Sequence, residues 1–330
     1  MHPPAPTRNA ILPPSARAAV PPSTPPSPPR SAFVAVLLAN IALAFGPWLV
    51  RMADTGPVAA GFWRITLAIP FLVVLSLASG ARPGRGNFQL SGRPLSGAMW
   101  LLLAAGGVAF AADLGSWHLG ILRTTLANAT LFGNSATLIF PIYGFLIARA
   151  WPTRVQALAL FLAFCGAALL MGRSYQLDPR HLAGDLLCIL AGILYTVYFI
   201  AMARARTTMA PLPALTLSTI ASSLPLLGFA LLLGERIWPT HWGALIGLAL
   251  ASQVFGQGLM IYALGKLSPL VVGIALLMQP IVAGTVGWIV YDERLGLPDM
   301  VGVVLVGIAL VLVRRGERPV APAPIEAQNG

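Results

Sequence analysis

The chain contains ten apolar stretches, each long enough to cross a lipid bilayer, which together fill most of residues 31–315. A helix of about 20 apolar residues crosses the hydrocarbon core, and only helices or closed barrels satisfy their backbone groups there. Barrel strands alternate apolar and polar residues, whereas the apolar runs here do not. The sequence therefore predicts an all-α integral membrane protein with spans at residues 33–51, 58–79, 96–118, 124–147, 154–172, 184–203, 212–233, 241–264, 269–290 and 299–313.

The composition excludes an ordinary soluble domain. Hydrophobic residues make up 57% of the chain and charged residues only 9%, whereas soluble domains carry roughly 25% charged residues. The net charge of +11 does not indicate a nucleic-acid partner, because the basic residues lie between the apolar stretches without a long basic run. The sequence also lacks the phosphate-binding loop, the HExxH zinc motif and the GxSxG nucleophile elbow. We therefore expect neither an enzyme nor a cofactor.

The basic residues indicate the orientation in the membrane. When the loops alternate between the two sides, 14 Lys and Arg residues lie on the side that holds both termini and 6 on the other side, with Arg64 inside the second span. Cytoplasmic loops carry the excess of basic residues. We predict a multi-pass protein of the inner (plasma) membrane of a bacterium, with both termini in the cytoplasm.

The two ends of the chain are rich in residues that do not form a packed core. Residues 1–30 contain five Pro-Pro pairs together with Ala, Ser and Arg. Such a segment cannot bury enough apolar surface to offset its ordering entropy. We expect disordered cytoplasmic tails at residues 1–30 and 316–330.

A weak internal match relates the two halves of the chain. Leu119-Gly120 corresponds to Leu264-Gly265 at an offset of 145 residues, which aligns Asn134 with Gln279. Five spans in each half is an odd number, so the second half lies upside down relative to the first. Inverted repeats of this kind are common in secondary transporters. We predict one five-helix repeat at residues 31–173 and another at residues 184–315.

Several short motifs resemble those of the drug/metabolite transporter superfamily, in its ten-helix EamA-type branch. They are Phe62-Trp63-Arg64, Leu264-Gly265 with Ser268-Pro269, and Gln279-Pro280 with Asp292-Glu293-Arg294. The resemblance covers residues 33–315 and implies an exporter of small metabolites, most directly amino acids. It implies alternating access through a central cavity, with a small-molecule substrate and the lipid bilayer as partners. The oligomeric state stays open.

Arg64 and Asp113 are charged residues far from the ends of their predicted spans. At 1.5 Å per residue, both lie on the order of 10–14 Å below the outer surface. Charged side chains at such depth are costly, and they usually face the protein interior, a cavity or each other. Three interpretations stay open: contact with a charged substrate, a structural ion pair, or an Arg64 side chain that extends outward to the membrane interface. Arg64 is therefore also a structural or gating candidate.

The remaining candidates are polar or aromatic residues inside apolar spans. Gln253 and Gln257 are four residues apart and therefore share one face of an α-helix, either as a cavity wall or as an interhelical contact. Pro141, Pro280 and Glu293 are structural or gating candidates, and His118 is expected to be a hydrated residue at a span end. The full set of cavity candidates is Trp48, Asp113, Trp117, Asn128, Asn134, Tyr195, Tyr198, Gln253, Gln257, Tyr262 and Gln279.

Two other functions stay open at this point. The first is proton-coupled export of hydrophobic cations, with Asp113 as the carboxylate that exchanges protons and substrate. The second belongs to another class: a membrane-embedded scaffold or a lipid-modifying enzyme. The odd number of spans in each half and the lack of a catalytic motif favour the metabolite exporter over this last class.

Overall fold

The computed structural model describes residues 29–79, 95–124, 129, 132–172, 179–282, 285 and 296–315, and its regular elements are helices. The prediction of an all-α protein is thereby confirmed for these residues. The predicted tails fall almost entirely outside them. The elements are α1 (Arg30–Ala44), α2 (Gly46–Met52), α3 (Pro57–Thr66), α4 (Ala68–Ala78), α5 (Gly97–Ile121), α7 (Ala136–Ala148), α8 (Arg154–Gly172), η1 (Pro179–His181), α9 (Leu182–Ala205), α10 (Pro211–Leu232), α11 (Gly243–Leu248), η2 (Ala249–Gln257), α12 (Gly258–Leu264), α13 (Pro269–Ala275) and α15 (Leu297–Arg315).

Six helical stretches of the described chain are long and apolar enough to cross a membrane by their length and composition. Three shorter apolar helices lie within the predicted spans 124–147, 154–172 and 269–290, and α15 covers the last predicted span. The six long stretches are Arg30–Met52, Pro57–Ala78, Gly97–Ile121, Pro179–Ala205, Pro211–Leu232 and Gly243–Leu264.

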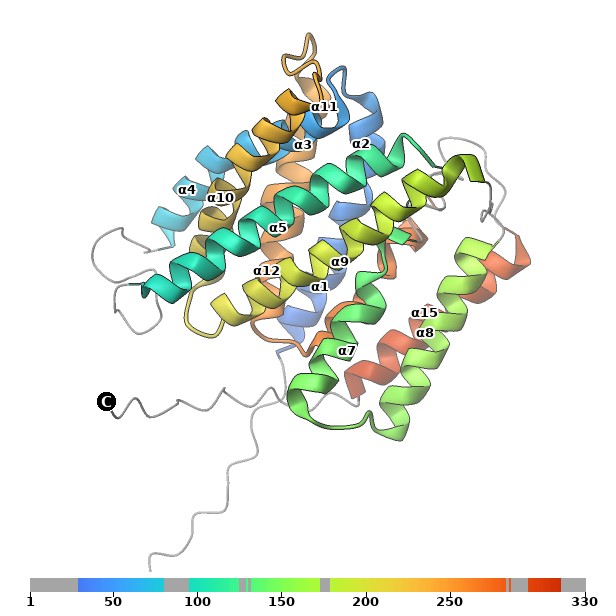
Figure 1. The fold of residues 1–330 in the computed structure, drawn as a ribbon. Helices are drawn as coiled ribbons and strands as arrows, with labels where there is room; N and C mark the ends of the chain where they lie inside the picture. Colours follow the sequence, from blue (N-terminus) through green and yellow to red (C-terminus); the bar gives the residue numbers. More distant parts are fainter. Residues whose placement is uncertain are drawn as a thin grey trace, which may run out of the picture.

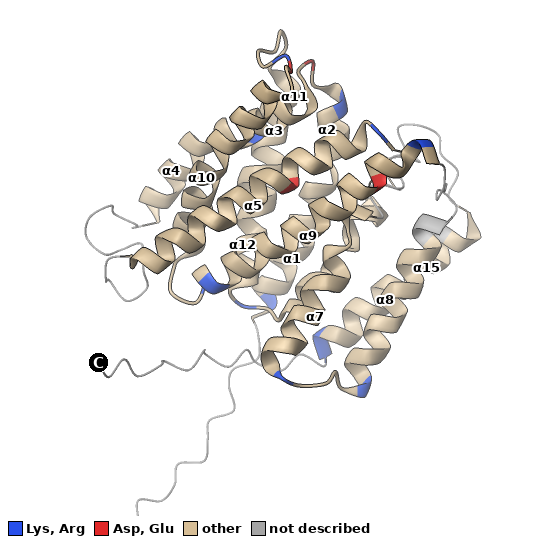
Figure 2. Ribbon diagram, viewed as in Figure 1, with Lys and Arg blue, Asp and Glu red and all other residues tan. Residues whose placement is uncertain are grey.

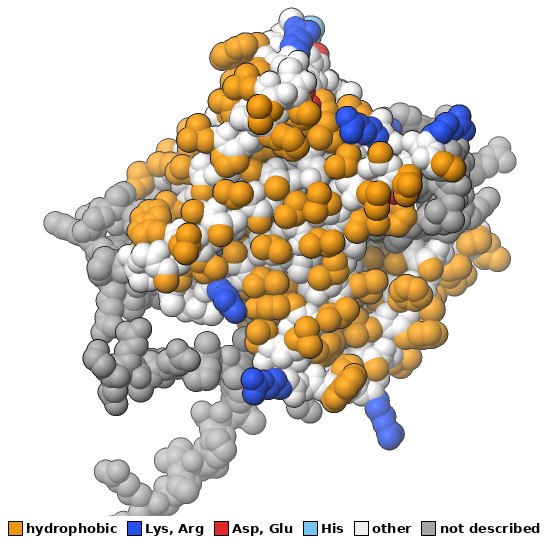
Figure 3. All heavy atoms as spheres, viewed as in Figure 1, with side chains coloured by type: hydrophobic (Ala, Val, Ile, Leu, Met, Phe, Trp, Pro, Cys, Tyr) orange, Lys and Arg blue, Asp and Glu red, His pale blue; other side chains and the backbone are white. Residues whose placement is uncertain are grey.

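The surface of the helices suits a lipid environment. Figure 2 shows that most charged residues lie toward the two ends of the helices, and Figure 3 shows apolar side chains over the stretches between them. Large apolar side chains point outward along these stretches, including Leu101 at 72% exposure and Leu224 at 76%. In water this surface would be unfavourable by roughly 25 cal/mol per Å², whereas lipid chains cover it without that cost.

The helices pack as a set of close pairs. Helix α5 lies between α9 and α10, α3 packs against α10, and α1 packs against η2 and α12; α7 packs against α13, and α8 against α15 (Figure 1). Glycine permits some of these close approaches. A Cβ atom at Gly106 of α5 would lie 2.9 Å from the Cβ of Ala201 in α9, and one at Gly273 of α13 would lie 2.5 Å from Cγ of Pro141 in α7.

Proline divides two of the spans into two helices each. Pro47 and Pro70 have no backbone N–H, so they cannot bond to the carbonyl four residues earlier. The breaks fall just before them: α1 ends at Ala44 and α2 begins at Gly46, while α3 ends at Thr66 and α4 begins at Ala68. Sharp bends in long helices commonly have this cause.

The stretch from Gly243 to Leu264 contains a π-helix in its middle. Residues Ala249–Gln257 form η2, between the α-helical turns of α11 and α12. A π-helix closes its hydrogen bonds from i to i+5, and such turns are rare and often lie at functional sites. This element carries both glutamines of the predicted polar face.

Two loops are hydrogen-bonded to each other at one end of the helices, and we call this the interloop contact of residues 53–56 and 233–242. Glu235 accepts hydrogen bonds from the first turn of α3: its Oε1 from the N–H of Val58 at 3.3 Å and its Oε2 from the N–H of Ala59 at 2.8 Å. A carboxylate at a helix N-terminus satisfies unpaired N–H groups and complements the helix dipole. The loop after α10 therefore caps α3.

A second carboxylate strengthens the interloop contact. Asp54 Oδ2 accepts hydrogen bonds from the side chain and the N–H of Thr240, the latter at 2.8 Å, and from the N–H of His241 at 3.2 Å. The bond from the Thr240 hydroxyl is the main reason that the pKa of Asp54 is lowered to about 2. Trp63 Nε1 also donates to the carbonyl of Ile237 at 2.7 Å. Asp54 before α3 and Trp63 within it are thus tied to the same loop.

Candidate functional site

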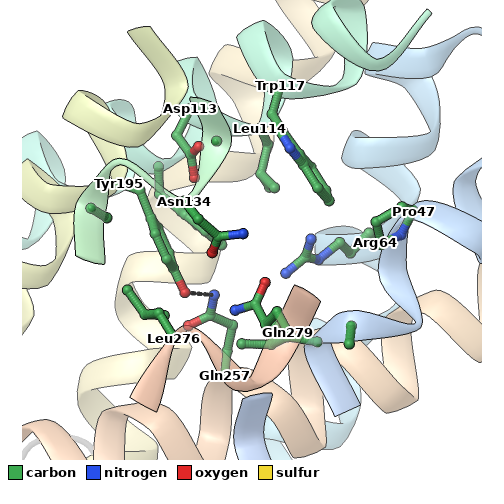
Figure 4. A pocket seen from close by; sticks show the side chains of 15 residues that line it. Pro47, Arg64, Asp113, Leu114, Trp117, Asn134, Tyr195, Gln257, Leu276 and Gln279 are labelled. Atoms are coloured by element: carbon green, nitrogen blue, oxygen red, sulfur yellow. Dashed lines mark hydrogen bonds between the residues drawn. The ribbon is translucent and has the colours of Figure 1, made fainter. Parts of the chain in front are cut away.

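A cavity of about 80 Å³ lies among helices from both halves of the chain. Its wall combines charged, amide and aromatic side chains with aliphatic ones, and Figure 4 shows the polar groups pointing toward its centre from several helices. Ligand sites in proteins are typically concave and largely apolar, with a few convergent polar groups. The lining residues are Leu43, Ala44, Pro47, Arg64, Phe110, Asp113, Leu114, Trp117, Gly133, Asn134, Ala136, Tyr195, Gln257, Leu276 and Gln279.

Arg64, near the end of α3, extends its guanidinium group into this cavity (Figure 4). The residue is 3% exposed, its Nε atom is buried without a hydrogen-bond partner, and its Cζ atom lies 5.9 Å from the centre of the Phe110 ring. The face of an aromatic ring attracts a cation, but it accepts no strong hydrogen bond. The terminal nitrogens therefore remain available to a molecule in the cavity.

Asp113 and Trp117 project from consecutive turns of α5 toward the same cavity (Figure 4). Asp113 is 8% exposed and interacts electrostatically with Arg64, yet the two side chains do not form a salt bridge with each other. The structural ion pair considered from the sequence is therefore not formed. The cavity instead presents two separate opposite charges.

Gln279 follows α13 in the sequence and lines the cavity, and a hydrogen bond to Asn40 of α1 holds its side chain. Its Nε2 donates to Oδ1 of Asn40 at 2.9 Å, and Asn40 Nδ2 donates in turn to the carbonyl of Val36 at 2.7 Å. This chain fixes the orientation of the Gln279 amide and uses one of its two N–H donors. The side chain lines the same cavity as Arg64 (Figure 4).

Gln257 and Tyr195 form a second oriented pair, which joins η2 to α9. The Gln257 Nε2 donates to the Tyr195 hydroxyl at 3.1 Å, while the Gln257 Oε1 atom is buried without a partner. Since the hydroxyl oxygen accepts this bond, its proton is free to be donated elsewhere. The Tyr195 ring packs against Phe199 with its centre 4.1 Å away, which holds it at the cavity wall.

Helix breaks supply part of the cavity wall. Helix α13 ends at Ala275, and the helical conformation resumes at Met278 after a turn. Pro280 cannot donate to the carbonyl of Leu276, which instead accepts from the N–H of Gln279 at 3.0 Å. Leu276 and Gln279 both line the cavity. Pro280 therefore lies next to the irregular turn that places Leu276 and Gln279 at the cavity wall.

A comparable turn precedes α7, where Asn134 lines the cavity. Asn134 and Ser135 form a turn between residues 132–133 and the start of α7 at Ala136, and the Asn134 carbonyl accepts from the N–H of Thr137 at 2.8 Å. Pro141 lies further along α7, buried against α13. It thus contributes to packing between α7 and α13.

Four predicted cavity residues lie outside the lining. Gln253 is fully buried and donates from Nε2 to Thr219 Oγ1 of α10 at 3.0 Å. Tyr198 is fully buried and stacks on Phe110 with ring centres 4.3 Å apart. Trp48 in α2 is half-buried and does not line the cavity.

Tyr262 is the fourth predicted cavity residue that does not line the cavity. Its hydroxyl bonds to Ser31 at 3.1 Å and accepts from Lys266 Nζ at 3.0 Å. These partners lie at the start of α1 and after α12, at an end of the helices and away from the cavity. The offset of 145 residues between the halves aligns Tyr262 with Trp117, but of these two residues only Trp117 lines the cavity.

His118 requires a correction. The sequence suggests a hydrated residue at the end of a span, but the side chain is fully buried, and its Nδ1 lies 2.6 Å from the carbonyl oxygen of Pro57. The start of α3 covers it, which the position of His118 within its own span does not reveal.

The candidates Asn128 and Glu293 lie outside the described residues.

Two residues with a role at the site are not among the candidates predicted from the sequence. Asn40, which orients Gln279, is a single amide in an apolar span, so the criterion that selected Asn134 would also have found it. Phe110 supports Arg64 and lines the cavity. A phenylalanine in an apolar helix gives no signal in the sequence.

Comparison with known proteins finds a similarity for the second half of the chain. The EamA-like transporter family matches residues 182–315, about two-fifths of the chain. A solved structure titled "Crystal structure of protein" is similar with a TM-score of 0.71 at 12% identity, over 86% of this chain and 96% of that one. At this identity the likeness shows the fold alone. A comparison with curated proteins finds no match.

Proposed function

We propose that the protein exports small metabolites, most directly amino acids, through the cavity described above; the similarity of residues 182–315 to the EamA-like transporter family supports this. The observation that carries this proposal is the cavity itself. Two charged residues and three amides meet in one enclosed space among helices that are otherwise apolar. Polar groups inside membrane helices are costly and typically mark a substrate pathway.

We propose further that ten helices form two inverted five-helix repeats. The packing pairs support this arrangement. In the proposed repeat, α5 corresponds to η2 and α12, and α9 corresponds to α1. The contact of α5 with α9 therefore has a counterpart in the contact of η2 and α12 with α1, and both contacts are present. The pairs α3 with α10, α7 with α13 and α8 with α15 each join a helix to its counterpart in the other half. A two-fold relation between the halves produces this pattern.

The helix breaks also support a substrate site between the repeats. The turn at residues 134–135 and the turn at residues 276–277 occur in the fourth and ninth predicted spans, which correspond to each other in the repeat. Discontinuous helices of this type commonly bind the substrate near the bilayer midplane in transporters with inverted repeats. Unpaired backbone groups are tolerated at that depth where they line a cavity.

Alternating access requires that each side of the cavity closes in turn. The interloop contact supports such a role for one side, because it fixes α3, which carries Arg64, to the loop after α10. We propose that this contact forms when that side is closed and separates when it opens. The rocking of one set of helices against the other would then expose the cavity.

The cavity favours amino acids over hydrophobic cations. Asp113 alone would suit a cation, but Arg64 faces the same space and repels one. A molecule with both charges meets a partner for each. The aromatic and aliphatic walls, including Trp117 and Leu114, accommodate an apolar side chain.

Counterflow in proteoliposomes tests this function. Vesicles loaded with an unlabelled amino acid should accumulate the same labelled amino acid, and a panel of the protein amino acids, simple carboxylates, simple amines and tetraphenylphosphonium ranks the substrates. Preferential counterflow of amino acids supports the proposal. Counterflow of tetraphenylphosphonium alone would replace it with cation export, and the absence of any exchange in a folded preparation would favour a scaffold or an enzyme.

A further inference from the structure

Arg64 and Asp113 are oppositely charged, face one cavity and do not form a salt bridge with each other. A guanidinium and a carboxylate in a low-dielectric interior attract each other strongly, and a buried charge without a partner is unfavourable. The described structure holds the two groups apart. The Phe110 ring contacts the Arg64 guanidinium, and Figure 4 shows the Asn134 amide near the Asp113 carboxylate.

The best complement to this arrangement is a molecule that carries both charges. A carboxylate accepts two parallel hydrogen bonds from a guanidinium group, and an ammonium group donates to a carboxylate. A ligand with one charge leaves either Arg64 or Asp113 unpaired, and a neutral ligand leaves both unpaired. Specificity then comes from the buried group that the wrong ligand fails to pair.

The other side chains that line the cavity suit a ligand whose two ends carry opposite charges. Gln279 lines the same cavity as Arg64, and one of its two N–H donors is bonded to Asn40. Across the cavity, the Tyr195 hydroxyl accepts from Gln257 and keeps its proton for donation. Trp117 contributes an aromatic ring to the wall of the same cavity (Figure 4).

We propose that Arg64 binds the carboxylate and Asp113 binds the ammonium group of a zwitterionic amino acid, and that transport depends on both ends being present. This assignment rests on the proposed function and specifies which residues select the substrate. Trp117 and Leu114 contact the apolar side chain of the bound amino acid.

The first test uses ligands alone and the unaltered protein. Competition against labelled leucine in detergent solution compares leucine with its methyl ester, which lacks the carboxylate charge, and with 4-methylpentanoate, which lacks the amine. Loss of a charged hydrogen-bond partner should weaken binding roughly 10- to 150-fold for each analogue. Binding of both analogues within about twofold of leucine would overturn the assignment. A phenylalanine series repeats the comparison for a larger side chain.

The second test assigns each end to its residue. In Arg64→Gln the preference for leucine over its methyl ester should disappear, while the preference over 4-methylpentanoate remains; in Asp113→Asn the reverse should hold. Arg64→Lys keeps the charge and should retain part of the ester preference. Arg51→Gln, which removes an exposed charge at the end of α2, serves as the control with both preferences intact. Equal losses of both preferences in each folded variant would refute the separate roles.

The outcomes separate this inference from the proposed function. If neither leucine nor phenylalanine binds and tetraphenylphosphonium does, amino acid export and the zwitterion site both fail. If amino acids are exchanged but the single-charge analogues compete equally well, the export function stands and the roles of Arg64 and Asp113 are wrong.

Discussion

The replacement Glu235→Ala should destabilise the protein, because it removes the tertiary cap of α3. Glu235 accepts hydrogen bonds from the N–H groups of Val58 and Ala59. Both residues are fully buried and Glu235 is half-buried, so water replaces the lost acceptor only incompletely. Pro57, the first residue of α3, has no N–H, which leaves these two groups as the donors that the cap must satisfy.

The magnitude follows from three contributions. Loss of an N-cap costs about 0.5–2 kcal/mol, loss of a negative charge at a helix N-terminus about 0.3–1 kcal/mol, and a buried donor left unpaired about 1–3 kcal/mol. These contributions overlap, and the bond from Val58 is long at 3.3 Å. We therefore expect a loss of about 2–4 kcal/mol in the free energy of unfolding.

Unfolding of the detergent-solubilised protein by sodium dodecyl sulfate, followed by tryptophan fluorescence, measures this loss. Glu235→Gln keeps one acceptor oxygen and loses the charge, so its free energy of unfolding should lie between those of the wild type and Glu235→Ala. Arg236→Ala, on the same loop but exposed, should change the free energy by less than about 0.5 kcal/mol. If Glu235→Ala is as stable as this control, the reasoning on the buried cap is refuted.

Four further predictions concern transport, topology and pH. Gln257→Ala or Gln279→Ala should weaken substrate affinity roughly 5- to 150-fold by leaving a polar group of the substrate unpaired, and each should also lower thermal stability because it removes a hydrogen bond between helices; lowered stability with normal transport per folded molecule would contradict the role in binding. A reporter fused after Arg315 should be active only in the cytoplasm, and periplasmic activity would reverse the orientation. Transport down a concentration gradient should persist without a pH difference, and Asp113→Asn should change affinity; strict dependence on a proton gradient, lost in this variant with binding intact, would favour proton antiport. Because the pKa of Asp54 is about 2 in the folded protein against a usual 3.8, its stabilising contribution should be complete above pH 4 and lost as the pH falls through 2. Acid titrations of stability should show this loss in the wild type and a smaller loss in Asp54→Asn.

The sequence was most informative where a polar residue interrupts an apolar span. Asp113, Asn134, Gln257 and Gln279 were selected on this basis, and all four line one cavity with Arg64. The physical reason is general: a polar group in hydrocarbon is unfavourable, so it points to the interior of the protein. The criterion finds groups that avoid lipid, but it does not distinguish a cavity from a buried hydrogen bond.

Gln253 shows this limit. The expectation that it shares the cavity with Gln257 assumed α-helical periodicity, whereas residues 249–257 form a π-helix that changes which residues stack. Gln253 reaches Thr219 of α10, and Gln257 reaches Tyr195 of α9. No local pattern in the sequence predicts a π-helix.

Contacts between distant segments account for the other differences. His118 is covered by the start of α3, 61 residues away in the sequence. Tyr262 is bound at its hydroxyl by Ser31 and Lys266. The position of a residue within its own helix gives its depth in the membrane, but its environment depends on which other helix lies beside it.

The π-helix also affects how this protein tolerates changes in length. A π-helical turn contains one more residue between its bonded groups than an α-helical turn. Deleting one residue from Ala249–Gln257 therefore leaves a continuous α-helix, with no loop to rebuild. The deletion would also turn Gln257 relative to Gln253 and separate it from Tyr195, whereas a deletion in α5 would shift every later contact of that helix. The length of the segment Ala249–Gln257 thus sets how Gln253 and Gln257 are oriented around the helix axis.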